Sequence, residues 1–177
     1  LSISLFTVLG LAVLAYVSIS SSVIGKESLE TIYEKNVVPD NEITNARATF
    51  DTILNDLIRV TSEFLPTGQA RDRIPKTEQK MNEFFAKALK SDFYTEPSLK
   101  KNLNEAYERY TQKIAPNFKK ILELYGKDKR EDIGDMAVEI EADCRYITQR
   151  FENISKFTNQ RVKDISVEIS GKLDKNL

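Results

Sequence analysis

The fold is decided by residues 133–158, which read IGDMAVEIEADCRYITQRFENISKFT. Two rows of apolar or small side chains run through this stretch, each with a spacing of seven residues. Spacings of three and four residues between the two rows place them on one face of an α-helix. We therefore expect a long amphipathic helix from about Glu131 to Leu177. The rows are Ile133, Ile140, Ile147 and Ile154, and Ala137, Cys144, Phe151, Thr158 and Ile165.

Three further amphipathic helices are expected before this one. Their apolar seams lie within residues 29–64, 74–89 and 99–125, and the connections between them are short. Helices of this kind pack by burying their apolar faces together. The pattern favours an all-α fold, namely an antiparallel up-down-up-down four-helix bundle.

Proline and glycine mark the expected ends and bends of these helices. The first helix should bend at Pro39 and end at Pro66-Thr67-Gly68. The third should end at Gly126, and its seam shifts by one residue around Pro116, where we expect a kink. The seam of the first helix is expected to reach Phe64.

The N-terminal segment has a different character from the rest of the chain. Residues 1–24 read LSISLFTVLGLAVLAYVSISSSVI and contain no charged side chain. A helix of this length is about 36 Å long, which exceeds the roughly 30 Å of a bilayer core. A secretory signal peptide is the alternative, but its apolar region is usually shorter and is followed by a small-residue cleavage site. We expect a transmembrane helix at 1–24, continuous with the first helix of a sensor domain at 25–177.

Composition excludes several classes of function. Lys and Arg total 26 and Asp and Glu total 27, so there is no basic excess for nucleic acid. The chain has no His and one Cys, which excludes Ser-His-Asp chemistry, His-ligated haem and the usual zinc hydrolase sites. No paired catalytic carboxylates stand out. We expect no enzyme, no cofactor and no metal site in this segment.

Two short motifs support a resemblance to a known family. Tyr33-x-x-Asn36-Val37-Val38-Pro39 follows the apolar segment, and Ala106-Tyr107-Glu108-Arg109-Tyr110 lies on the third helix. With the helix layout, they resemble the four-helix-bundle ligand-binding domain of bacterial methyl-accepting chemotaxis proteins.

That resemblance implies a homodimer in the bacterial inner (cell) membrane with a periplasmic sensor domain. It also implies a second membrane span, a HAMP linker and a cytoplasmic hairpin acting with a chemotaxis kinase and a coupling protein. Such a domain would bind a small molecule, such as a carboxylate or an amino acid, and signal by helix movement. The long last helix fits this, because it would return to the membrane near Leu177.

The sequence leaves open three alternatives to a chemoreceptor sensor domain. The same input domain occurs in sensor histidine kinases and cyclases. A membrane-anchored helical protein could bind other proteins and no small molecule. A periplasmic helical adaptor with a cleaved leader is the third.

Arginine supplies a planar fork of donors suited to a carboxylate. If residues of equal height on the first and last helices are paired, Arg59 is level with Asp143, so that Arg145 and Tyr146 lie within one turn. Arg73 should lie near the same level. These residues form one candidate ligand site, and exposed surface arginines are the alternative.

A second candidate group is formed by Tyr107, Arg109 and Tyr110. A tyrosine can stack on a ligand ring and donate a hydrogen bond. A core tyrosine with its hydroxyl at the edge is the alternative. Cys144, on the apolar seam, is expected to be a buried small side chain.

Overall fold

The structure of the protein is a computed structural model that describes Lys26 and residues 38–175. All the secondary structure of these residues is helical, which confirms the all-α prediction for the described part of the chain. The transmembrane helix predicted at 1–24, the N-terminal part of the Tyr33–Pro39 motif and the predicted bend around Pro39 lie outside the described residues or at their edge. The helices are α2 (Val38–Thr61), α3 (Thr67–Ala88), the 3-10 helix η2 (Asp92–Thr95), α4 (Pro97–Arg109), the π-helix η3 (Tyr110–Ile114), α5 (Ala115–Gly126) and α6 (Arg130–Lys175).

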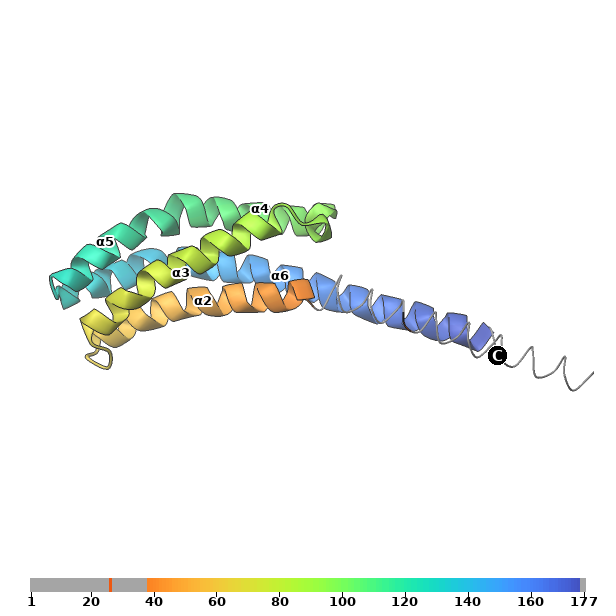
Figure 1. Ribbon diagram of the computed structural model, residues 1–177, viewed down its shortest axis with the longest axis horizontal. Coiled ribbons are helices and arrows are strands. Elements are labelled where there is room, and N and C mark those ends of the chain that lie inside the picture. The colour runs from red at the N-terminus through yellow and green to blue at the C-terminus, as the bar shows by residue number, and fades with distance from the viewer. Residues whose placement is uncertain (1–25, 27–37, 176–177) are drawn as a thin grey trace, which may run out of the picture. The chain divides into compact units, whose positions relative to one another are not determined.

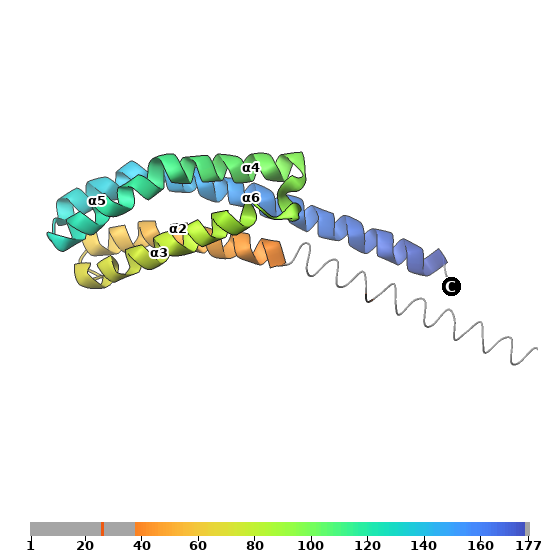
Figure 2. The same ribbon diagram turned by 45° about the horizontal axis from the view of Figure 1, so that its top comes forward.

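The chain divides into two compact units, and the one from Asp40 to Phe157 contains the whole of the described core. Within that unit, α2, α3, the α4–η3–α5 stretch and the first part of α6 lie side by side (Figures 1 and 2). Each of these four stretches contributes buried side chains to a single hydrophobic cluster. The unit is therefore built by helix-on-helix packing around one core.

Ion pairs fix the relative direction of α2 and α6. Arg47 contacts Glu152 at 2.8 Å, and Glu63 contacts Arg130 at 2.7 Å. Arg47 lies on α2 and Glu63 in the turn that follows this helix, so later residues of this segment meet earlier residues of α6. The two helices run antiparallel, and Asp40 and Phe157 lie at the same end of this unit.

The predicted apolar seams form the core. On α6 every seam residue from Ile133 to Thr158 is buried, and on α4–α5 the same holds from Leu99 to Tyr125. Burial of such side chains contributes roughly 1.5–3 kcal/mol each. On α2 the buried seam residues are Ile43, Ala46, Phe50, Ile53, Leu57 and Val60.

The first seam ends earlier than its spacing suggests. Phe64 is 77% exposed, so its predicted place in the seam is wrong. Helix α2 ends at Thr61, and Glu63 adopts a left-handed conformation with φ of 63°. The chain turns there, and Leu65 is buried in place of Phe64. Gly68 lies within α3 and not in the connection, since α3 begins at Thr67.

The register shift near Pro116 takes the form of a π-helical turn. The segment Tyr110–Ile114 is π-helical, and α5 follows it directly with Pro116 in its first turn. A π-turn holds one more residue than an α-turn. The extra residue lets Tyr110 and Ile114 both point into the core. The predicted end of this helix at Gly126 is confirmed.

No helix among residues 38–175 is both long enough and apolar enough to cross a bilayer.

Candidate functional site

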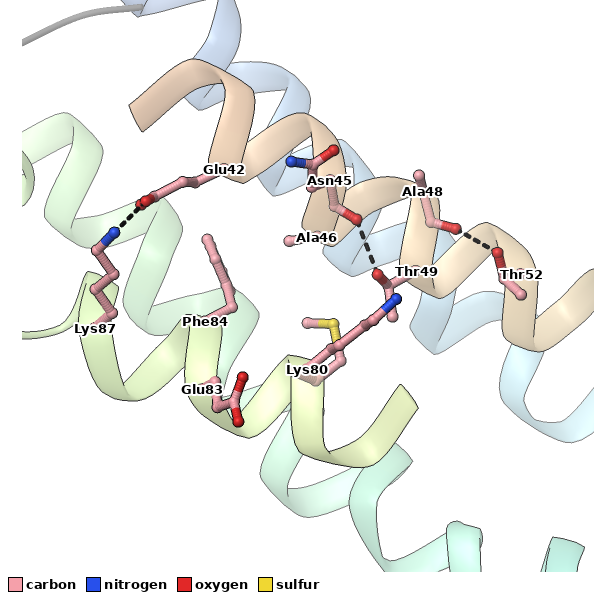
Figure 3. A pocket seen from close by; sticks show the side chains of 11 residues that line it. Glu42, Asn45, Ala46, Ala48, Thr49, Thr52, Lys80, Glu83, Phe84 and Lys87 are labelled. Carbon is pink, nitrogen blue, oxygen red and sulfur yellow. Dashed lines mark hydrogen bonds and ion pairs between the residues drawn. The ribbon is translucent and has the colours of Figure 1, made fainter. Parts of the chain in front are cut away.

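A groove of about 550 Å³ lies between α2 and α3 in the Asp40–Phe157 unit. Figure 3 shows α2 side chains on one side of it and α3 side chains on the other. The α2 wall consists of small or short side chains, and this leaves space where a larger residue would contact α3. The residues involved are Asn45, Ala46, Ala48, Thr49 and Thr52.

The apolar part of the groove is held rigidly. Met81 and Ala46 are buried, and Phe84 is partly buried. The Phe84 ring packs edge-on against Phe85 and Phe151, with centroids 5.1 Å and 5.5 Å away. A ligand would meet this surface without having to order it first.

The polar groups of the groove differ in how they are satisfied. The Thr49 hydroxyl donates to the Asn45 carbonyl at 2.9 Å, and the Thr52 hydroxyl donates to the Ala48 carbonyl at 2.8 Å. Each hydroxyl oxygen therefore retains acceptor capacity only. Lys80 forms no ion pair or hydrogen bond within residues 38–175. On α3 the groove thus offers the ammonium group of Lys80 and, three residues later, the carboxylate of Glu83, which accepts a hydrogen bond from Gln79 at 2.7 Å. On α2 it offers hydrogen-bond acceptors.

One end of the groove is bridged. Lys87 of α3 forms an ion pair with Glu42 of α2, drawn as a dashed line in Figure 3. This pair neutralises both charges. It leaves Lys80 as the lysine whose charge is available to a ligand.

Arg109 and Tyr146, both predicted as ligand residues, are brought together in a different place. The guanidinium groups of Arg109 and Arg150 lie 4.5 Å and 4.4 Å from the centroid of the Tyr146 ring. Arg109 donates to Asp143 at 2.8 Å, and Arg150 forms an ion pair with Glu105 at 2.7 Å. Cation–π contacts and ion pairs of this kind tie α4 to α6.

This cluster, formed by Glu105, Arg109, Asp143, Tyr146 and Arg150, borders a smaller polar hollow of about 310 Å³. Both guanidinium groups already have carboxylate partners, so an anionic ligand would have to displace them. A structural role is the better reading of these contacts. The sequence pattern missed Glu105, Asp143 and Arg150, because charges on helix faces rarely reveal their partners on other helices.

Tyr110 and Tyr107, both predicted as ligand residues, differ in burial. Tyr110 is 1% exposed, and its hydroxyl donates to Asn82 Oδ1 at 2.8 Å. Its ring stacks on Phe85 at 5.1 Å and meets Phe50 edge-on at 6.0 Å. Burial raises the pKa of its phenol well above the ordinary value, and Glu78 adds to this shift. Tyr107 is exposed at its outer edge.

The three remaining predicted arginines have separate surroundings. Arg73 donates to both oxygens of the buried Asp56, at 2.9 Å and 3.2 Å. Arg145 pairs with Glu141 on its own helix at 2.6 Å. Arg59 is exposed and has no described ion-pair partner. No contact joins these arginines to one another in the described residues.

The height assigned to Arg59 from the sequence also differs from the structure. A Cβ placed on Gly134 would lie 3.2 Å from Thr61 Cγ2, so these two residues face each other. Antiparallel packing then puts Arg59 level with Met136, two turns before Asp143. Arg145 instead borders a hollow of about 450 Å³ between α2 and α6, together with Asp51 and Leu54.

Cys144 is buried as expected, with 1% of its surface exposed. Burial raises the pKa of its thiol to about 12, and the nearby carboxylates of Asp143 and Asp51 contribute in the same direction. The thiol is therefore protonated and unreactive at neutral pH.

Within residues 38–175, no group of three or more acidic or cysteine side chains is arranged to hold a metal ion. Comparison of the chain with protein families, with curated proteins and with solved structures finds no significant match.

Proposed function

We propose that the chain is the extracytoplasmic sensing domain of a bacterial transmembrane chemoreceptor, arranged as an up-down-up-down four-helix bundle. The proposal is carried by one observation. Asp40 and Phe157, the two ends of the core unit, lie at the same end, because α2 and α6 are antiparallel neighbours. A domain inserted between two spans of the same membrane needs this arrangement. The uncharged segment at 1–24 supplies the first span in this proposal.

Signal transmission would use α6. This helix runs from Arg130 to Lys175. A ligand that binds better to one packing of α6 against α2 shifts the equilibrium between two packings. A small piston movement or rotation would carry that shift along the helix.

A homodimer is part of this proposal. Ile58 on α2 and Val138 on α6 are 56% and 73% exposed, and each lies one turn beyond the Thr61–Gly134 contact. Exposed large apolar side chains on adjacent helices are typical of an interaction surface. In nanodiscs, Ile58→Glu should lower the dimer fraction in cross-linking experiments. Leu89→Glu, at an exposed apolar position on the connection after α3, should leave it unchanged.

Calorimetry tests ligand binding directly. The 177-residue chain in lipid nanodiscs is titrated with a panel of amino acids and organic acids. Binding of at least one compound supports the proposal, and the same titrations with Arg145→Ala test the hollow between α2 and α6. If no compound binds, a membrane-anchored helical protein without a small-molecule ligand is favoured. A histidine kinase or cyclase output remains the alternative for the same input domain.

A further inference from the structure

The groove between α2 and α3 has the chemistry of a selective ligand site. We infer that it binds a small monocarboxylate that carries a hydrogen-bond donor next to the carboxylate and an apolar tail. This inference rests on the proposed sensing function and names the site and ligand class that the function would use. Its arrangement is distinct from the predicted arginine sites, since none of those arginines borders the groove.

The carboxylate is assigned to Lys80. This ammonium group faces the groove from α3 and has no described anionic partner, whereas Lys87 is neutralised by Glu42. A ligand carboxylate would form a charge-assisted hydrogen bond with this exposed ammonium group. The free amide of Asn45 on the opposite wall can also donate to it.

The donor group of the ligand is assigned to the α2 wall. The Thr49 and Thr52 hydroxyl hydrogens are used on backbone carbonyls, so these side chains present lone pairs to the groove. A hydroxyl or ammonium group beside the ligand carboxylate would find an acceptor there. A plain carboxylic acid without such a donor would leave this wall unsatisfied.

The apolar tail is assigned to the exposed part of the Phe84 ring, because Met81 and Ala46, which also line the groove, are only 0% and 4% exposed. A phenyl or branched alkyl group would cover the Phe84 ring and remove apolar area from water. The volume of about 550 Å³ lies in the range of small-molecule sites. The Lys87–Glu42 bridge across one end favours a compact ligand over a continuous partner helix.

Methyl NMR on the 177-residue chain in nanodiscs tests the site. The chain has two methionines, so labelled methionine methyl groups give two signals. Both methionines are buried, but Met81 lines the groove whereas Met136, on α6, does not and serves as an internal control. The probes are 3-phenyllactate, phenylalanine and 3-phenylpropionate, which carry a hydroxyl, an ammonium or no donor beside the carboxylate.

We expect 3-phenyllactate or phenylalanine to shift the Met81 signal and leave the Met136 signal in place. Lys80→Ala should weaken binding about tenfold or more, and Lys76→Ala, one turn earlier on α3, should not. Thr49→Val keeps the shape but removes the acceptor, and should reduce the preference over 3-phenylpropionate about fivefold.

Three outcomes overturn the inference: no Met81 shift with any probe, equal weakening by both lysine variants, or binding of 3-phenylpropionate as tight as that of the other two. If another compound binds and Lys80→Ala does not affect it, sensing stands and this site falls. If the probes bind in the groove but produce no output from a signalling fusion, the site stands and the sensing function falls.

Discussion

At the scale of single residues, the contacts of Tyr110 indicate a structural role for this side chain and not a ligand-binding one. Its hydroxyl bonds to Asn82, which is exposed and can turn to water, while its ring fills the aromatic core. Tyr110→Phe should therefore cost about 1 kcal/mol of unfolding free energy. Tyr110→Ala should cost about 3–5 kcal/mol, because it leaves a cavity. Urea unfolding of a fragment spanning residues 38–177, followed by circular dichroism, measures both; equal costs would contradict the assignment.

Cys144 makes the folding stability of the Asp40–Phe157 unit depend on pH in the alkaline range. Its thiol pKa is raised from 9.0 to about 12 in the folded state, so the unfolded chain loses this proton first as pH rises. The unfolded state then binds fewer protons, and folding stability falls between pH 9 and 12 while staying level below pH 9. The buried phenols of Tyr94, Tyr110 and Tyr125 have raised pKa values and act in the same direction.

Cys144→Ala should therefore reduce the loss of folding stability that occurs as the pH rises above 9. Urea midpoints of the parent and the variant are compared at pH 8 and pH 10.5. The gap between the two proteins is expected to narrow at the higher pH. A gap that stays constant would mean that the thiol titrates normally when folded.

At the scale of elements, the helices could be predicted from the sequence because their apolar rows are long and regular. The seven-residue spacing of its isoleucines is enough to predict the seam of α6, and the extent of this spacing predicts the length of the helix. The turn after Thr61 could not be read in this way, because Phe64 continues the spacing while the backbone has already left the helix. The spacing of apolar residues predicts that a helix forms. It does not predict the residue at which the helix ends, because that depends on contacts with the rest of the fold.

The residues of the candidate sites are harder to predict from the sequence than the helices, because their contacts join different helices. Arg109 and Tyr146 were found as chemically suited side chains, but their partners Asp143 and Arg150 depend on how α4 and α6 are placed side by side. The groove is signalled in the sequence only by the small or short side chains of Ala46, Ala48 and Thr49 on α2, a pattern that also fits a close helix contact. The height of Arg59 was wrong by two turns because it was derived from an assumed membrane surface.

The π-turn supports a prediction about this same element. Deleting the exposed Thr111 restores a regular spacing between Tyr110 and the later core residues, so the helix should become α-helical with its seam intact. Deleting the exposed Lys119 turns Ile121 and Tyr125 out of the core. We expect a change within about 1 kcal/mol for the first deletion and a loss above roughly 3 kcal/mol for the second. Equal losses in urea unfolding would contradict this account of the π-turn.

At the scale of the whole molecule, the antiparallel contact between α2 and α6 can be fixed covalently. Thr61→Cys with Gly134→Cys, in a Cys144→Ala background, should oxidise to an intramolecular disulfide, because a Cβ placed on Gly134 would lie 3.2 Å from Thr61 Cγ2. The bond should stabilise the unit by about 2–4 kcal/mol. Thr61→Cys with Glu141→Cys, two turns further along α6, is the control and should stay reduced. Non-reducing gels and urea unfolding report both results.

The central claim of the proposed function is that ligand binding in the Asp40–Phe157 unit changes how α6 packs, and that this change is transmitted along α6. The most direct test fuses the chain at Leu177 to the second span and kinase-control region of a characterised chemoreceptor, and measures kinase activity against amino and organic acids. We predict that a compound that binds also changes kinase activity, and that the oxidised Thr61–Gly134 cysteine pair suppresses the change while binding persists. Binding without any change in kinase activity, in the unlinked protein, would contradict the account.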